Sequence, residues 1–142
     1  MNEAVDRVAT AAGLLWLGMV LAISFLEAPL KFRAPGLEVR VGLAIGRIVF
    51  RALNTAEIGW ALVIVVALII HVPSLAVAAS ASVAVVVLVA QLGAVRPGLI
   101  RRSDRVLAGE DVPRSPSHHL YIVAEVIKVI ALIVLGASLL SH

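Results

Sequence analysis

Cysteine is absent from the 142 residues of this chain, and charged residues make up only 15% of it. Without cysteine there are no disulfides, thiolate metal sites or cysteine nucleophiles. The sequence also lacks G-x-S-x-G, H-E-x-x-H and a phosphate-cradling glycine loop, the patterns typical of several hydrolytic and nucleotide-binding sites. These absences lead us to expect no enzymatic activity, no cofactor and no metal site.

Apolar residues, in contrast, make up 61% of the chain, and the mean hydropathy is +1.06. A water-soluble domain is usually no more than about half apolar, so lipid must be the solvent for much of this one. The net charge of +3 and the pI near 10.2 indicate attraction to the anionic headgroups of a bilayer. Because the basic residues border apolar runs, no nucleic-acid partner is expected.

Four apolar runs of helical length predict an all-α, integral membrane four-helix bundle, formed by the single domain 1–142. About 20 residues of helix span the hydrocarbon core of a bilayer. The predicted helices cover about 8–26, 48–70, 75–95 and 119–140. Trp16 and Trp60 fall near the middle of their helices, and not at an interface, where tryptophan is usually enriched.

Two basic segments, 28–47 and 96–118, separate these helices, and we interpret both as loops. Pro29 and Pro97 should end the first and third helices, because proline disfavours helix in the residue before it. From Leu37 onward, helical spacing predicts a surface helix or an extension of the second span. Apolar residues within 99–107 are consistent with one short interfacial helix.

The third predicted helix carries a small residue at every fourth position, at Ala76, Ser80 and Ala84. Small residues along one stripe let neighbouring helix backbones approach closely in lipid. We therefore expect this helix to be the most closely packed of the four.

Basic residues are distributed unevenly between the two sides of the predicted membrane domain. The first basic segment, counted to Arg51, and the second together contain Lys31, Arg33, Arg40, Arg47, Arg51, Arg96, Arg101, Arg102, Arg105 and Arg114. The opposite side has only Arg7. Because cytoplasmic loops are enriched in lysine and arginine, both basic segments are predicted to be cytoplasmic. Both termini then lie on the non-cytoplasmic side of the cell (inner or plasma) membrane.

Polar side chains within the predicted spans gather in the half nearest the basic segments. The candidate polar cluster, or ligand or ion site, comprises Glu27, Arg47, Arg51, Asn54, Glu57, Gln91, His118, Tyr121, Glu125 and Lys128. On the second and fourth spans these residues follow one another in steps of three or four, which places them on one helix face. Ionisable groups inside hydrocarbon cost about 2.5 to 3.5 kcal/mol unless they pair, so we expect Glu125 and Lys128 to pair with Glu57 and Asn54.

Two interpretations of this cluster stay open. Its three glutamates balance Arg47, Arg51 and Lys128, and a neutral set can satisfy itself as a structural network. The chain is then a structural or partner-binding membrane protein, including a homo-oligomer. In the alternative it is a small transporter or binding protein for a proton, an ion or a small charged solute, with Glu57, Glu125 and Lys128 as its site. The apolar outer half offers no polar route, which favours the first interpretation.

Three short stretches, at residues 15–18, 24–32 and 46–54, carry a W-x-G, an A-P-x-x-F and a G-x-x-F-like pattern. In the third, Gly46 and Phe50 are one residue further apart than in the pattern. These stretches resemble small four-helix bacterial membrane proteins of unknown function, distantly like eukaryotic transmembrane protein 205. The resemblance implies a four-helix membrane fold and no activity, ligand or site residue. Glu125 and Lys128 have no counterpart in the pattern.

Overall fold

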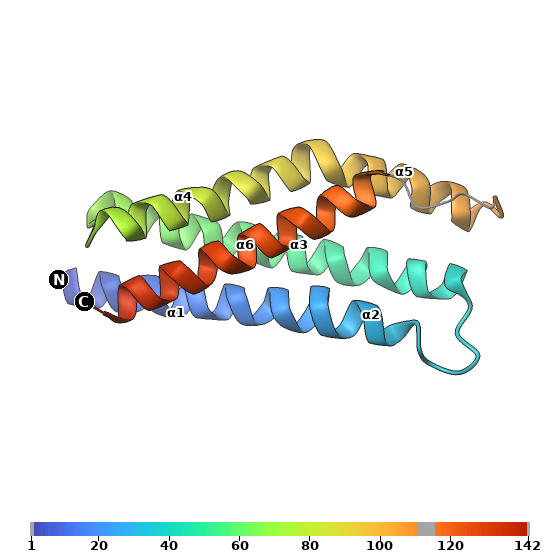
Figure 1. Ribbon diagram of the computed structural model, residues 1–142, viewed down its shortest axis with the longest axis horizontal. Helices are drawn as coiled ribbons and strands as arrows, with labels where there is room; N and C mark the ends of the chain where they lie inside the picture. The colour runs from blue at the N-terminus through green and yellow to red at the C-terminus, as the bar shows by residue number, and fades with distance from the viewer. Residues whose placement is uncertain (1, 111–115, 142) are drawn as a thin grey trace.

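The computed structural model describes residues 2–110 and 116–141, and every regular element in them is helical. Four helices there are long and apolar enough to cross a membrane: Glu3–Lys31, Val39–Ile70, Leu75–Leu107 and His119–Leu140. They pack as a four-helix bundle (Figure 1). The predicted all-α fold with four membrane helices is confirmed, and the chain is a multi-pass membrane protein.

The first and third spans are each assembled from several helical elements. In chain order the elements are α1 (Asn2–Val20), η1 (Leu21–Glu27), α2 (Ala28–Lys31), α3 (Val39–Ile70), α4 (Leu75–Ala90), η2 (Gln91–Val95), α5 (Arg96–Leu107) and α6 (Pro116–Leu140). The elements α1, η1 and α2 form one continuous helix, and so do α4, η2 and α5.

Pro29 and Pro97 do not end these two helices, contrary to the expectation from sequence. Each proline is preceded by a π-helical segment that finishes two residues before it, η1 at Glu27 and η2 at Val95. A proline has no N–H, and its ring clashes with the carbonyl four residues earlier. The wider π-helical turn relieves that conflict, so the helix continues beyond the proline.

The two basic segments are consequently helical over most of their described length and are not loops. The extension of the second span is confirmed, since α3 begins at Val39. The short connection before it contains Gly36 in the left-handed region, at φ +78°. The third span continues through α5 to Leu107. Residues 111–115 lie outside the described part of the chain.

The core is formed where α1 packs on α3 and α6, and where α4 packs on α6. Trp16, Leu132 and Leu135 are fully buried there. Ser80 and Ala84, from the predicted stripe of small residues, are also buried, and α4 and α6 are in extensive contact. Large apolar side chains such as Leu75, which is 84% exposed, cover the outside of the bundle, as expected where lipid is the solvent.

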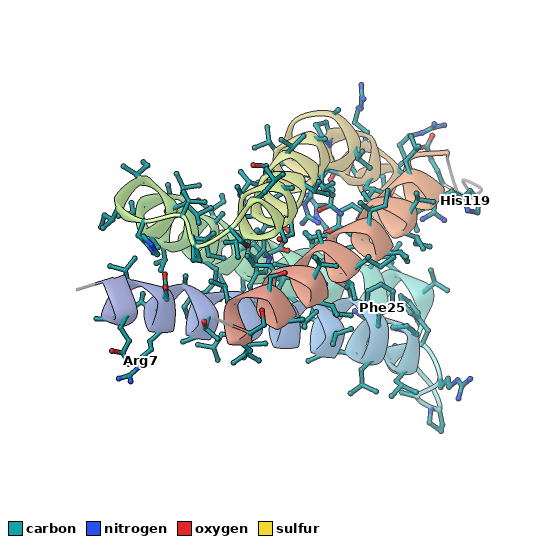
Figure 2. All side chains as sticks on the ribbon, turned by 60° about the vertical axis from the view of Figure 1, so that its left-hand side comes forward. Arg7, Phe25 and His119 are labelled. Carbon is teal, nitrogen blue, oxygen red and sulfur yellow. The ribbon has the colours of Figure 1, made fainter. Side chains whose placement is uncertain are left out.

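Both termini lie at one end of the bundle, and the basic segments α2 and α5 lie at the other (Figure 1). Figure 2 shows this polarity at the level of side chains: Arg7 projects from the terminal end and His119 lies at the opposite end. We call these the terminal end and the basic end.

Candidate functional site

A fully buried lysine, Lys128 of α6, lies at the centre of the polar core. Its ammonium nitrogen is 2.5 Å from Glu57 Oε1, 2.6 Å from Glu125 Oε1 and 2.8 Å from Gln91 Oε1. An ammonium has three hydrogen-bond donors, and here all three have an acceptor. Protein groups alone therefore supply three acceptors for the ammonium of Lys128 inside the bundle.

Hydrogen bonds and ion pairs of these carboxyl and amide groups join all four spans. Trp16 on α1 donates its indole N–H to Glu57 Oε1 on α3, at 3.0 Å. Gln91, at the start of η2, donates its amide to Glu125 Oε1 on α6, at 2.7 Å. All of these side chains are at most 2% exposed. We call Trp16, Glu57, Gln91, Glu125 and Lys128 the core network.

Glu27, Arg47 and Arg51, which belong to the charge-neutral set of the sequence analysis, are not part of the core network. Two carboxylates, Glu57 and Glu125, face one ammonium. Each carboxylate also has a second oxygen, Oε2, that is buried and has no hydrogen-bond partner in the described part of the chain.

None of the other predicted site residues belongs to the core network, although Arg47 and Tyr121 line a pocket beside it. Arg47 pairs with Asp104 on α5 at 2.6 Å, and both side chains are substantially exposed. Arg51 is exposed, and Glu27 approaches Lys31 at 3.5 Å. Asn54 is buried one turn before Glu57 but makes none of the bonds of the core network. Gln91, and not Asn54, is the amide that binds Lys128. The side chain of His118 lies outside the described residues.

A pocket of about 420 Å³ lies between the core network and the basic end. Its lining comes from η1 and α2, the first turns of α3, α5, and the first turns of α6. Glu125 belongs both to this lining and to the core network, so the pocket and the network share a side chain. Four cationic side chains contribute to the lining, namely Lys31, Arg47, Arg96 and Arg102.

The pocket lining also contains three hydroxyl groups without partners. Ser24 Oγ, Ser103 Oγ and Tyr121 OH are buried, and none has a hydrogen-bond partner among the described residues. Ser103 and Tyr121 are each only 8% exposed. An unsatisfied buried polar group costs about 1 to 3 kcal/mol, so three around one cavity require an explanation.

Two aromatic rings of the pocket lining contact each other, and one of them contacts a cation of the lining. The Phe50 and Tyr121 rings meet edge to face with centroids 6.0 Å apart. The Arg96 guanidinium lies 5.9 Å from the Phe50 centroid, within the range of a cation–π contact. It lies near the Tyr121 hydroxyl without forming a hydrogen bond of regular geometry.

Two glycines of α3 allow the end of the first span to approach. A Cβ atom on Gly42 would overlap the Phe32 ring, and one on Gly46 would lie 3.3 Å from Lys31 Nζ. Phe32 and Lys31 can therefore rest directly on α3 and form one wall of the pocket. The G-x-x-x-G spacing of these glycines is used for packing within the chain.

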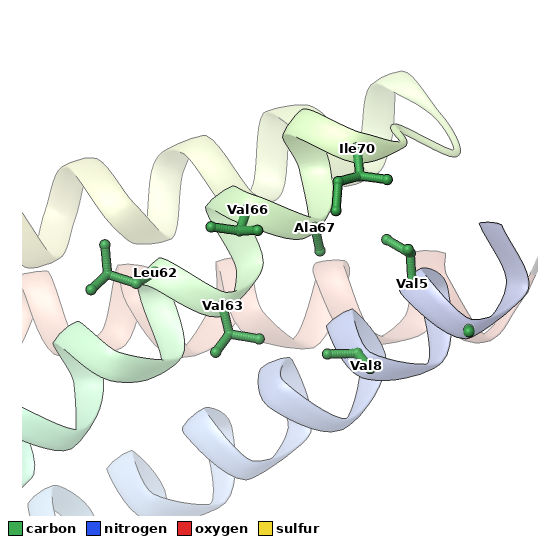
Figure 3. A pocket seen from close by; sticks show the side chains of 8 residues that line it. Val5, Val8, Leu62, Val63, Val66, Ala67 and Ile70 are labelled. Atoms are coloured by element: carbon green, nitrogen blue, oxygen red, sulfur yellow. The ribbon is translucent and has the colours of Figure 1, made fainter. Parts of the chain in front are cut away.

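The terminal end has a different kind of cavity, an apolar groove of about 490 Å³ between α1 and α3. Figure 3 shows Val5 and Val8 of α1 facing Val63 and Ala67 of α3 across it. The residues that line the groove are alanine, valine, leucine and isoleucine. Among the described residues, no polar side chain lines this groove.

The sequence analysis did not predict the following residues as part of the site: Trp16, Ser24, Lys31, Arg96, Arg102 and Ser103. One signal for Trp16 was available, because an indole N–H at mid-span requires an acceptor. Lys31, Arg96, Arg102 and Ser103 were assigned to loops because Pro29 and Pro97 were expected to end their helices. The local sequence does not indicate that α2 and α5 line the same pocket.

The fold and the core network define a multi-pass membrane protein with a charged interior and a basic pocket. In comparisons with known proteins, no family model matches this chain, and no curated protein or solved structure matches it. Its function must therefore be argued from the site itself.

Proposed function

We propose that this chain is a membrane-embedded binding protein for a small charged solute, which enters the pocket at the basic end. The observation that carries the proposal is that Glu125 lines the pocket and also belongs to the core network. A solute that contacts Glu125 therefore acts on a group bonded, through Lys128, to all four spans. Binding could thus be communicated to the whole bundle.

The pocket has the properties of a ligand site. Its volume falls in the range of about 300 to 1,000 Å³ that is usual for small-molecule sites, and its lining combines apolar side chains with a few polar groups. Ionisable groups inside a membrane protein commonly mark solute sites. The apolar groove at the terminal end supports binding at one side over passage through the protein.

A thermal-shift screen of the purified protein against ions, lipids and small metabolites tests this proposal. A ligand at a hundredfold excess over its dissociation constant stabilises the folded state by about 2.7 kcal/mol. We expect a stabilising solute whose effect is lost in Glu125→Gln. Glu57→Gln is the matched control, because it removes the same charge from the same network at a residue that does not line the pocket.

Equal loss of the effect in both variants would mean that the solute acts through the general stability of the network. No stabilising solute in a broad screen would count against a binding function.

A second candidate function is structural or partner-binding, with a homo-oligomer included. The observation in its favour is that one set of hydrogen bonds joins all four spans, as a network that fixes helix register would. Light scattering of the protein in detergent, at several concentrations, tests self-association. A stable oligomer together with no ligand in the screen would favour this candidate.

We also propose that the basic end faces the cytoplasm, in a cell membrane, with both termini on the other side. The ten-to-one distribution of basic residues supports this orientation. The basic end would then draw its solute from the cytosol or from anionic lipids of the inner leaflet.

A further inference from the structure

We infer that the pocket binds a phosphate monoester attached to an apolar chain. The inference rests on the proposed function and names the class of its solute. It starts from the residues that line one cavity of about 420 Å³, which include four cations and three side chains whose buried hydroxyl has no hydrogen-bond partner among the described residues.

The donors indicate an anion with several oxygens. Lys31 and Arg47 already have carboxylate partners, at 3.5 and 2.6 Å, and their charges are partly offset. Arg96 lines the pocket, and its guanidinium lies 5.9 Å from the centroid of the Phe50 ring. Guanidinium groups bind phosphate and carboxylate oxygens in fixed, often paired, geometry. Three hydroxyl donors beside them suit the three terminal oxygens of a phosphate monoester better than the two of a carboxylate.

Glu125 selects further among anions. A carboxylate in the lining repels an anion unless a proton lies between them, and its Oε2 atom is a buried acceptor without a donor. A phosphate monoester has a second pKa near 6, so it readily retains one P–OH group. That hydroxyl can donate to Glu125 Oε2 while the other oxygens accept from the cations and hydroxyls. A sulfate ester of the same charge has no such proton.

The rest of the lining indicates the apolar part of the ligand. Phe25, Phe32, Leu43 and Ile122 belong to it, together with other apolar side chains of the same spans. These residues exclude a freely hydrated ion and favour a head group attached to a hydrocarbon body. Basic pockets between membrane helices bind phosphate head groups of lipids in the same manner.

The test compares octyl phosphate with octyl sulfate and inorganic phosphate, on the purified full-length protein in neutral detergent at pH 6. We expect octyl phosphate to bind at least tenfold more tightly than octyl sulfate and to raise the unfolding temperature. In Glu125→Gln the preference for phosphate over sulfate should disappear. Glu57→Gln should retain it.

Two further variants separate binding from folding. Tyr121→Phe and Ser103→Ala remove hydroxyls that have no partner, so the unfolding temperature without ligand should not fall. Each should weaken octyl phosphate binding by about tenfold, the effect of one hydrogen bond to a charged group. Unchanged binding in both variants would overturn the assignment of the pocket.

The source of the phosphate is decided in nanodiscs. Phosphatidic acid has a phosphate monoester head, whereas phosphatidylglycerol has a diester without the second ionisable oxygen. If phosphatidic acid raises the unfolding temperature and phosphatidylglycerol does not, the ligand is a membrane lipid. If octyl phosphate binds and neither lipid changes the unfolding temperature, the ligand is a soluble ester.

Equal binding of octyl sulfate, or equal binding of inorganic phosphate without a chain, would overturn the inference. Stabilisation by a cation or a carboxylate through Glu125 would overturn it and leave the proposed binding function intact.

Discussion

The ammonium of Lys128 on α6 lies 2.5 Å from the carboxylate of Glu57 on α3, and both side chains are completely buried. The two helices are the second and the fourth of the four spans, so this ion pair links parts of the chain about 70 residues apart. A buried ion pair contributes little net stability, but losing one partner is costly, because the other charge remains in a dry environment. This asymmetry gives the first prediction.

Lys128→Met should lower the free energy of unfolding by about 3 to 5 kcal/mol, because both Glu57 and Glu125 lose their counter-charge. Arg51→Met is the matched control on an exposed side chain, where a change within about 0.5 kcal/mol is expected. Unfolding in a mild detergent, followed by circular dichroism, measures both. Similar stability of the two variants would contradict the network.

Glu57→Gln should cost far less than Lys128→Met, and no more than about 2 kcal/mol. Replacing Glu57 leaves the ion pair between Lys128 and Glu125 in place. The glutamine oxygen can still accept hydrogen bonds from Trp16 and Lys128, although these are weaker than bonds to a charged group. A loss as large as that of Lys128→Met would show that the second carboxylate is itself required for folding.

Trp16→Phe should be more destabilising than Trp60→Phe. The indole of Trp16 donates to a carboxylate oxygen at 3.0 Å, whereas that of Trp60 donates to the sulfur of Met19, a weak acceptor. The first change should cost about 1 to 3 kcal/mol beyond the second, since it removes a donor from a buried acceptor. Chemical denaturation of the two variants measures the difference, and an equal loss would argue against the Trp16–Glu57 bond.

Reporter fusions test the proposed orientation. Fusions at Gly36 and Gly109, in the turns at the basic end, should report the cytoplasm, and fusions at Ser74 and His142 the opposite side. Neutralising Arg7 should leave this pattern unchanged, because the basic end would still hold the large excess of cations. A cytoplasmic signal at Ser74 would reverse the orientation.

The four spans were predictable because a membrane helix is recognised by its length and its apolar composition. The positions of Glu57, Glu125 and Lys128 along their helices followed from helix geometry. The prolines were misleading. Pro29 and Pro97 act locally against helix, but tertiary packing and one π-helical segment before each let the helices continue.

The composition of the site was less predictable than its depth. Steps of three and four along a helix identify a face but do not identify the residues opposite it. Asn54 and Gln91 were therefore equivalent from sequence, and only packing makes Gln91 the partner of Glu125 and Lys128. The pocket depended on α2 and α5, which the sequence had assigned to loops.

The position of Lys128 on the final span has a consequence for how the protein is made. Glu57 and Gln91 are synthesised, and can enter the bilayer, before the cation that satisfies them exists as part of the nascent chain. Until α6 is made, Glu57 lacks its partner Lys128, and α6 completes the core network. The last helix to be translated thus supplies the ammonium of the core network.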